Sequence, residues 1–321
     1  MGVLRSVDDT IAWVIAYSTS PVLGLIGTAL YIWSSYTPFI VLAIANLVVW
    51  VLSRCGINSS TMWRADDQTV LITGGARGVG FELALTMASK GSRVAILDVV
   101  VPETVPDNCM ALKCDVSDEQ QVNNAVCRIQ QEFGPISILI NMAGIINGRK
   151  ITNLTAKQIR KNFDVNVLAH FWTVRAVLPD MISANRGQIV TMASALGFSG
   201  CPRAGDYCAA KAALISFHEA LRYELIRHDG IKTILVCAGA ISTGMFDGVR
   251  YRVPYLTPVL TPKEVSDRIV YALESNRNRT IYMPLYVHFM PLLRLLPDFV
   301  SDWVHEITGA NTAMDYWKGR K

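Results

Sequence analysis

Short β-rich runs alternate with helical stretches from residue 69 onward, and this alternation constrains the fold more than any other feature. Nearly continuous apolar runs are expected to form strands at Thr69–Thr73, Arg93–Asp98, Met110–Asp115, Ser137–Met142, Gly187–Ala193, Lys232–Cys237 and Thr280–Met283. Helices are expected between them at Glu82–Lys90, Asp118–Phe133, Asn162–Ile182 and Tyr207–Arg227. Apolar strands that alternate with helices are typical of a parallel sheet covered on both faces. We therefore predict an α/β fold with a doubly wound parallel sheet of about seven strands.

A glycine-rich turn follows the first expected strand, with the sequence Thr-Gly-Gly-Ala-Arg-Gly-Val-Gly from Thr73 to Gly80, and a helix follows it. Glycine permits a tight turn and a close approach of the backbone to a pyrophosphate, which binds the free N–H groups at the helix N-terminus. The position between a strand and a helix distinguishes this turn from an ordinary glycine loop. We expect a dinucleotide to bind at Gly74, Ala76, Arg77, Gly78, Val79 and Gly80.

The type of nucleotide depends on two residues of opposite charge. Asp98 ends the second expected strand, where a carboxylate can bind the adenosine ribose hydroxyls and would repel a 2′-phosphate. Arg77 in the glycine turn could instead contact a 2′-phosphate. We expect NAD, and NADP remains the open alternative.

Asp115 and Val116 follow the third expected strand and are placed to border the adenine. An N-cap of the next helix is an equally good interpretation of this segment, and Ser117 or Asp118 could also fill that role.

Tyr207 and Lys211 are four residues apart in an expected helix, so both side chains lie on one face. A phenol has a pKa of about 10, and a nearby ammonium lowers that pKa because it stabilises the phenolate. Such a phenol can exchange a proton with an alcohol or ketone near neutral pH. Alone, the pair fits equally well an amphipathic helix with a half-buried tyrosine and a solvated lysine.

Taken as a set, these motifs resemble the signature of the short-chain dehydrogenase/reductase family between about residues 67 and 285. The set consists of Thr73–Gly80, Asn141-Met-Ala-Gly144, Asn166, Ser194 and Tyr207-x-x-x-Lys211. The sequence around Ala169–Thr173, Ile189–Ser194, Gly205–Lys211 and Thr243–Gly248 is similar to a membrane-bound subgroup. That subgroup contains epidermal retinal dehydrogenases and lipid-droplet 17β-hydroxysteroid dehydrogenases.

The resemblance implies a Rossmann-type fold and a role for each matching residue. Tyr207 would be the acid/base, and Lys211 would lower its pKa and hold the nicotinamide ribose. Ser194 would bind the substrate oxygen, and Asn166 would position a water that links Lys211 to solvent. Cofactor contacts are implied for Asn141, Ala143, Gly144, Tyr207, Lys211 and Thr243. The family also implies a homodimer through the helices that begin near Asn162 and Tyr207.

Two residues depart from the family pattern. Met142 replaces the usual second asparagine of Asn-Asn-Ala-Gly, so we expect some loss of hydrogen bonding near the sheet and no loss of chemistry. Ala238 replaces the usual proline after the sixth strand, which loosens that turn.

The N-terminal part has no charged residue from Ile11 to Ser53. Its apolar runs at 11–33 and 39–52 suit a membrane anchor, since one bilayer crossing takes about 20 residues. Residues 1–66 are therefore predicted to be the anchor, and 67–321 the catalytic domain; a buried soluble hairpin is the alternative. Arg5, Arg54 and Arg64 flank the apolar runs and favour a cytosolic orientation of both ends. Seven scattered cysteines also fit a cytosolic catalytic domain, on an endoplasmic reticulum or lipid-droplet membrane.

The C-terminal part is expected to shape the substrate site. Residues 244–260 are rich in apolar side chains and suit an apolar ligand. Leu285–Pro297 is too short to span a bilayer, and it fits either a segment on the membrane surface or a core helix within the C-terminal part, 285–321. The histidines have no metal-binding spacing, and no basic cluster suggests nucleic acid.

These observations predict a membrane-anchored NAD-linked dehydrogenase of a lipophilic secondary or allylic alcohol, such as a sterol, steroid or retinoid. An NADPH-linked ketoreductase of lipid metabolism is the alternative within catalysis. A lipid-droplet or reticulum scaffold without turnover is the alternative outside it.

Overall fold

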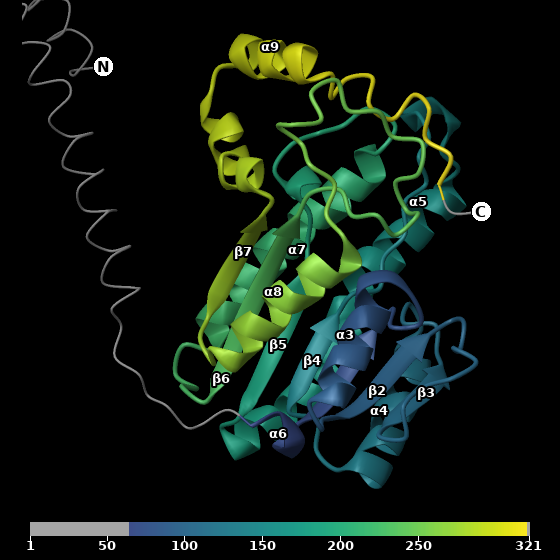
Figure 1. Cartoon of the computed structure of the whole chain (residues 1–321), viewed down its shortest axis with the longest axis vertical. Helices are drawn as coiled ribbons and strands as arrows, with labels where there is room; N and C mark the ends of the chain where they lie inside the picture. The colour runs from purple at the N-terminus through teal and green to yellow at the C-terminus, as the bar shows by residue number, and fades with distance from the viewer. Residues whose placement is uncertain (1–63, 320–321) are drawn as a thin grey trace, which may run out of the picture. The chain divides into compact units, whose positions relative to one another are not determined.

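The computed structural model describes residues 64–319, which contain one seven-stranded sheet in the order β3-β2-β1-β4-β5-β6-β7 (Figure 1). Every neighbouring pair of strands is parallel. The strands are β1 (Thr69–Thr73), β2 (Arg93–Asp98), β3 (Cys109–Lys113), β4 (Ile138–Asn141), β5 (Gly187–Met192), β6 (Ile231–Ala238) and β7 (Arg279–Met283). The predicted Rossmann-like α/β sheet of about seven strands is confirmed.

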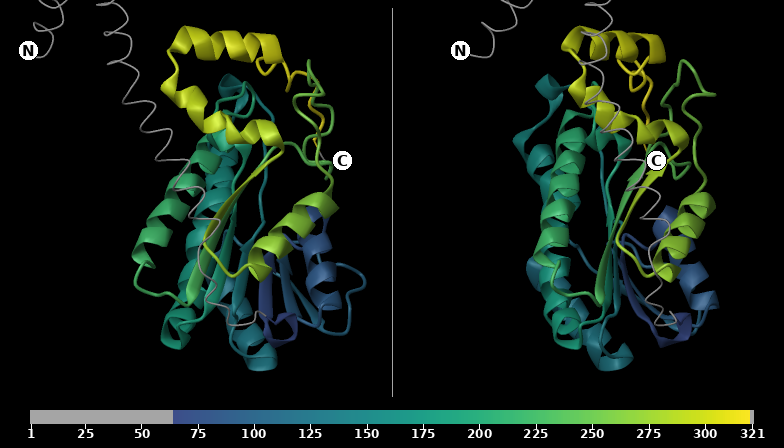
Figure 2. Two further views of the ribbon diagram at one scale, coloured as in Figure 1. Left: turned by 60° about the vertical axis from the view of Figure 1, so that its left-hand side comes forward. Right: turned by 90° about the vertical axis from the view of Figure 1, so that its left-hand side faces the viewer.

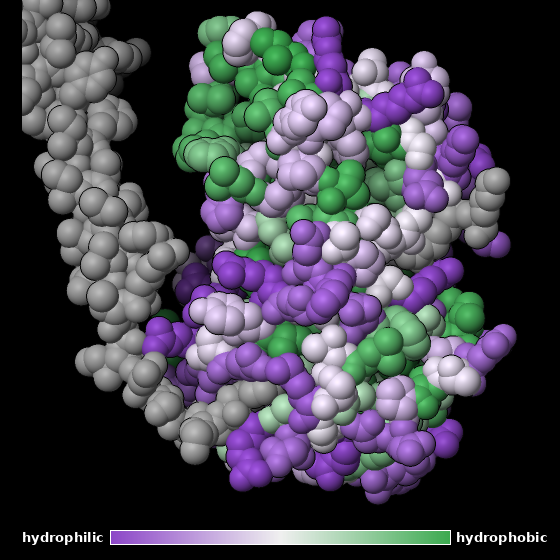
Figure 3. Space-filling view, viewed as in Figure 1, coloured by the Kyte–Doolittle hydropathy of each residue, from purple (hydrophilic) through white to green (hydrophobic). Residues whose placement is uncertain are grey.

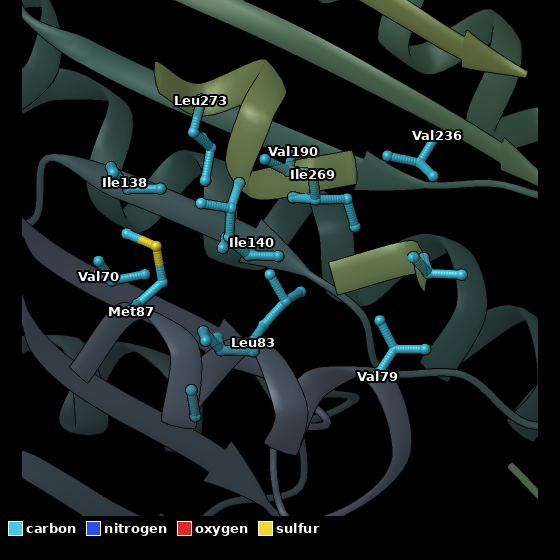
Figure 4. Packing of buried hydrophobic residues seen from close by; sticks show 14 of the residues in the cluster. Val70, Val79, Leu83, Met87, Ile138, Ile140, Val190, Val236, Ile269 and Leu273 are labelled. Carbon is cyan, nitrogen blue, oxygen red and sulfur yellow. The ribbon is translucent and has the colours of Figure 1, made fainter. Parts of the chain in front are cut away.

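Helices cover both faces of this sheet (Figure 2). The covering helices are α3 (Gly78–Ser89), α4 (Glu119–Phe133), α6 (Ala169–Ala184), α7 (Gly205–Glu224) and α8 (Pro262–Glu274). The structure also contains α5 (Ala156–Phe163) and α9 (Asp298–Thr308). Apolar residues of α3 and α8 pack on one face of the sheet, where Leu83, Met87 and Ile269 contact the strands (Figure 4). Residues of α4, α6 and α7, such as Ile129 and Val177, pack on the other. Both faces of the central strands are therefore buried, which explains their continuous apolar sequences.

Local signals fix where several helices begin. Asp118 is the N-cap of α4, since its carboxylate accepts hydrogen bonds from the N–H groups of Gln120 and Gln121. The N-cap is thus Asp118 rather than Asp115 or Ser117. Helix α8 is not among the predicted helices, although Thr261 and Glu264 form a capping box and Pro262 follows the cap.

Several predicted bounds shift by one to four residues, and two of the differences lie at the site. β3 ends at Lys113, two residues before Asp115, because the chain leaves the sheet after Cys114 donates its N–H to the carbonyl of Asp98. The single helix expected at Asn162–Ile182 is interrupted by a π-helical turn, η3 (Asp164–Leu168), between α5 and α6. A π-helical turn of this kind often marks a functional site.

The C-terminal segment builds a cover at the carboxyl end of the strands (Figure 1). After β7 it forms two 3-10 helices, η5 (Leu285–His288) and η6 (Met290–Leu295), followed by α9. No helix within residues 64–319 has the length and apolar character needed to cross a membrane. The expected anchor segments at 11–33 and 39–52 lie outside the described residues.

Candidate active site

A cleft of about 260 Å³ lies at the carboxyl ends of the central strands, and most of the predicted site residues line it. Those that line it are Gly74, Arg77, Val79, Gly80, Asp98, Asp115, Val116, Ala143, Gly144, Ser194, Tyr207, Lys211 and Thr243. Four predicted residues are not part of this lining: Ala76, Gly78, Asn141 and Asn166. Ligands of open α/β sheets bind in this kind of crevice.

The glycine turn needs glycine at two positions for different reasons. Gly74 has a left-handed backbone with φ of 66°, and a Cβ there would lie 2.7 Å from Cα of Ala143. A Cβ on Gly80 would collide with the carbonyl oxygen of Gly74. Arg77, the N-cap of α3, makes no capping hydrogen bond with its side chain. The glycine turn is therefore compact, and no side chain of Arg77 caps the N–H groups at the start of α3. Anion binding at a helix N-terminus requires such uncapped N–H groups.

Asp98 closes this turn from the end of β2. Its Oδ2 accepts a 3.0 Å hydrogen bond from the N–H of Ala76, and its Oδ1 accepts one of 3.3 Å from Val100. Ala76 thus contributes its backbone to the turn even though it does not line the cleft. The carboxylate is fixed at the cleft wall, where ribose hydroxyls would meet it.

Asp115 pairs with a lysine that the sequence analysis missed. Nζ of Lys161 donates to Oδ2 of Asp115 at 2.7 Å and to the hydroxyl of Ser117 at 2.8 Å. Burial raises the pKa of Asp115, but hydrogen bonds from Lys161 and Ser117 outweigh it and hold the pKa below its usual value. Lys161 could not be found from sequence because it lies on α5, far from Asp115 along the chain.

Ser194 and Tyr207 meet where β5 ends and α7 begins. Ser194 follows β5 directly, and its hydroxyl donates to the carbonyl of Ala238 at 3.4 Å and accepts from the N–H of Leu196 at 3.2 Å. Tyr207 lies in the first turn of α7, and the Ser194 hydroxyl is near enough to act on the pKa of its phenol. Phe246 packs edge-on against the Tyr207 ring, with ring centroids 5.9 Å apart. Two hydroxyls are thereby presented together to the cleft.

Lys211 lies one helical turn after Tyr207, as predicted, and is only 3% exposed. Its Nζ donates to the carbonyl of Met192 at 2.7 Å and lies 5.6 Å from the centroid of the Tyr207 ring. Burial lowers the pKa of Lys211 to about 8.

The low pKa expected for Tyr207 is not found with the protein's own groups alone. Burial raises the pKa of Tyr207 well above its ordinary value, and the nearby Ser194 hydroxyl only partly offsets this effect. Desolvation therefore disfavours the phenolate in the protein alone.

Asn166 lies in the π-helical turn and is fully buried. Its side chain accepts from the N–H of Ile145 at 3.0 Å and donates to the Ile145 carbonyl at 2.8 Å and to Asn162 at 3.0 Å. A Cβ on Gly144 would lie 2.9 Å from Oδ1 of Asn166 and 3.8 Å from Nζ of Lys211. Asn166 thus lies behind the cleft close to Lys211, and its role in holding a water stays a prediction.

Asn141 is buried under the cleft. Its Oδ1 accepts a 2.9 Å hydrogen bond from Thr173 of α6, while its Nδ2 has no partner within residues 64–319. Met142 lines the cleft beside it and packs against the core. The buried unpaired amide agrees with the expected loss of hydrogen bonding at Met142.

A second cavity of about 160 Å³ adjoins the first at Ser194, Gly239 and Phe246, which line both. Its walls come mainly from the segment after β6 and from η5, η6 and α9, through residues such as Val249, Tyr251, Tyr286, Leu293 and Val304. Sequence analysis expected an apolar lining from 244–260, but the individual residues carried no recognisable signal.

The two cavities together suit a nicotinamide nucleotide and an apolar partner. When bound, the nucleotide supplies hydride transfer to or from carbon. The glycine turn and the start of α3 would hold its phosphates, Asp98 its ribose, and Lys211 would lie beside Tyr207. The Ser194 and Tyr207 hydroxyls would bind the substrate oxygen, and Tyr207 would exchange its proton with that oxygen.

Comparisons with known proteins agree with this geometry. The family profile described as short chain dehydrogenase matches residues 68–253. Epidermal retinol dehydrogenase 2 of Homo sapiens is 36% identical over 267 residues, covering 79% of this chain and 86% of the relative. 17-beta-hydroxysteroid dehydrogenase 13 of Mus musculus is 34% identical over 250 residues, covering 74% and 81%. A solved short-chain dehydrogenase from Streptomyces avermitilis, 22% identical, has a TM-score of 0.63 over 74% of this chain and 96% of its own.

The matched region contains the glycine turn, Ser194, Tyr207 and Lys211, and the solved structure shares the fold. The chain therefore belongs to the short-chain dehydrogenases, NAD(P)-dependent oxidoreductases that act on alcohols.

Proposed function

We propose that this chain is a membrane-anchored, NAD-linked dehydrogenase of lipophilic secondary or allylic alcohols such as sterols, steroids or retinoids. The observation that carries the proposal is the apolar cavity beside Ser194, because it adjoins the nucleotide cleft and is built from the C-terminal cover. An apolar pocket with a few placed polar groups is typical of a site for a lipophilic small molecule. Two relatives are named for retinol and for 17-beta-hydroxysteroids, which supports the same chemical class.

The cover is fastened to the loop that carries Ser194. The hydroxyl of Ser199 and Nε2 of His305 are 2.7 Å apart, which joins that loop to α9. Arg294 of η6 donates to the carbonyls of Gly197 at 2.8 Å and Phe198 at 3.0 Å. These contacts hold the C-terminal cover beside the reacting hydroxyls, so the cover forms a wall of the apolar cavity.

The same cover carries an exposed apolar face, which supports a membrane location. Hydrophobic side chains gather over the segment from η5 to α9 in the upper left of Figure 3. Those that are exposed are Leu285, Phe289, Leu292, Leu295, Leu296, Phe299, Trp303 and Ile307. On α9, Phe299, Trp303 and Ile307 recur every four residues on one face, whereas Val304 and Thr308 line the cavity.

An amphipathic helix with aromatic residues on its apolar face suits the boundary between lipid and water. We propose that this face rests in the membrane and that the lipophilic substrate reaches the cavity from the bilayer. In this proposal residues 1–66 anchor the chain, and the catalytic domain faces the cytosol on the endoplasmic reticulum or a lipid droplet. A homodimer is a further expectation of the family.

NAD is favoured over NADP by the fixed carboxylate of Asp98 at the cleft wall, since it would repel a 2′-phosphate. Arg77 also lines the cleft and favours the second candidate, an NADPH-linked ketoreductase of lipid metabolism. Affinities for NADH and NADPH distinguish the two.

The proposal is tested by nucleotide reduction in membranes that contain the protein, with NAD and NADP in parallel, against steroids, retinol and fatty alcohols. We expect NADH formation with a lipophilic alcohol and little with ethanol or glycerol. The Tyr207→Phe variant in the same membranes is the control for background enzymes. Turnover only of small polar alcohols would contradict the proposed substrate class.

A further inference from the structure

Two tyrosines that the proposed proton transfer does not use face the apolar cavity. Tyr286 comes from η5 and Tyr251 from the segment after β6, and both line the cavity. The two phenols are close enough that Tyr286 contributes to raising the pKa of Tyr251. Other polar side chains of this wall have partners within the fold: Ser199 with His305, and Thr257 and Thr308 with backbone carbonyls. Two further phenols call for a chemical reason, because burying a hydroxyl without a partner is costly.

Neither phenol hydroxyl has a hydrogen-bond partner in the part of the chain that the structure describes. The phenol hydroxyls of Tyr251 and Tyr286 form no hydrogen bond with another group of residues 64–319, although the backbone carbonyl of Tyr286 accepts one from Phe289. Burial raises the pKa of Tyr286 to about 12 and also raises that of Tyr251. Both hydroxyls are therefore neutral at physiological pH, each free to donate one hydrogen bond and to accept another.

The location of Tyr286 places it close to the chemistry. Its hydroxyl lies against Gly239, where a Cβ would collide with it, so glycine makes room for this phenol. Gly239 lines both cavities and follows Ala238, whose carbonyl accepts the hydrogen bond from Ser194. The cavity thus presents the Ser194 hydroxyl, next to Tyr207 of the adjoining cleft, and separately the phenols of Tyr286 and Tyr251.

We propose that Tyr286, supported by Tyr251, binds a second oxygen of the substrate. The substrate is then a lipophilic alcohol or ketone that carries another carbonyl or hydroxyl, rather than an alcohol whose remainder is pure hydrocarbon. A site that hydrogen-bonds a substrate oxygen discriminates strongly against the analogue without it, because the buried polar groups are left unpaired. This inference rests on the proposed function and narrows its substrate class.

Androstanol and androsterone test the proposal, because they share one ring skeleton and differ by one carbonyl. Retinol and a fatty alcohol have one oxygen each, and each is compared with the diol that has the same carbon skeleton. We expect the wild-type protein in membranes to show a kcat/KM at least about tenfold higher for the member with two oxygens. The Tyr286→Phe variant removes one hydroxyl and should reduce that preference to about twofold or less, mainly through KM.

Tyr255→Phe is the matched control, since Tyr255 lies in the same segment as Tyr251 and is 96% exposed. It should keep the wild-type preference, and all variants should keep the wild-type melting temperature. Equal preference of the wild type for one or two oxygens, or an unchanged preference in Tyr286→Phe, would overturn the inference. An equal loss of kcat/KM for both members of a pair in Tyr286→Phe would also overturn the inference. The Tyr286 hydroxyl would then serve the fold or the proton transfer rather than the second oxygen. Absence of turnover of every alcohol with either nucleotide would instead remove the proposed function itself.

Discussion

Lys211 donates a 2.7 Å hydrogen bond from Nζ to the carbonyl oxygen of Met192. This bond joins the first turns of α7 to the last residue of β5, two positions before Ser194. The buried ammonium of Lys211 thus connects β5, which leads to Ser194, with α7, which carries Tyr207. Burying this charge changes how the free energy of unfolding depends on pH, which can be measured.

Lys211→Met is predicted to abolish turnover and yet to change the pH dependence of stability. The folded pKa of Lys211 is about 8 and the unfolded value is 10.5, so between these values the unfolded chain binds more protons. The wild-type free energy of unfolding therefore gains a contribution as pH rises from about 8 to 10, roughly 3 kcal/mol in full, which the variant lacks. Unfolding of detergent-solubilised protein at several pH values measures the difference.

The control for this comparison is Lys157→Met, because Lys157 is exposed on α5. It should follow the wild-type curve throughout. If the difference between Lys211→Met and the wild type stays constant across the pH range, Lys211 carries no buried charge.

Tyr207→Phe is predicted to lower kcat by at least about a thousandfold while nucleotide binding persists. The substitution removes only the hydroxyl that exchanges a proton with the substrate, and the ring still packs against Phe246. Steady-state kinetics and titration with NADH measure the two effects separately. Tyr223→Phe, on the exposed side of the same helix, serves as the control; substantial activity in Tyr207→Phe would refute the acid/base role.

Asp98→Ala is predicted to weaken NADH binding by about tenfold and to leave NADPH binding equal or stronger. The variant loses the ribose partner and also the acceptor for the N–H groups of Ala76 and Val100. Fluorescence titration with both nucleotides measures the ratio of affinities, and Asp107→Ala in the exposed loop after β2 is the control. An unchanged ratio would show that Asp98 does not select the nucleotide.

His218→Gln is predicted to make the protein more resistant to acid. Burial lowers the pKa of His218 to about 4, and its Nδ1 lies 3.1 Å from the hydroxyl of Thr191. The unfolded chain protonates this imidazole below its ordinary pKa of 6.5, so wild-type stability falls as pH drops from there toward 4. Melting temperatures across this range should fall less steeply in His218→Gln than in the wild type or in His228→Gln, and equal slopes would contradict the prediction.

The sheet and the nucleotide cleft could be predicted because their signals are local. The bounds of β1 and β2 match the prediction, since short apolar runs with turn residues between them leave few alternatives. Tyr207 and Lys211 lie on one face because helical spacing determines that relationship.

Features that depend on distant contacts were missed or misjudged. The partnership of Lys161 with Asp115 joins residues 46 positions apart, and no spacing rule predicts it. The raised pKa of Tyr207 depends on how deeply Phe246 and Met314 bury the phenol, which sequence spacing does not reveal. The lining of the apolar cavity likewise comes from segments that meet only in the folded chain.

The exposed face of α9 leads to a prediction about the membrane. Trp303 is 63% exposed in line with Phe299 and Ile307, so it should enter the lipid if this face rests there. In vesicles that contain the full chain, brominated lipids should quench the Trp303 fluorescence, obtained as the difference between the wild type and Trp303→Phe. The same difference for Trp172→Phe, on α6, should show weaker quenching. If Trp303 is quenched no more than Trp172, while the chain remains bound to vesicles, the C-terminal cover faces water and the proposed entry of substrate from the bilayer fails.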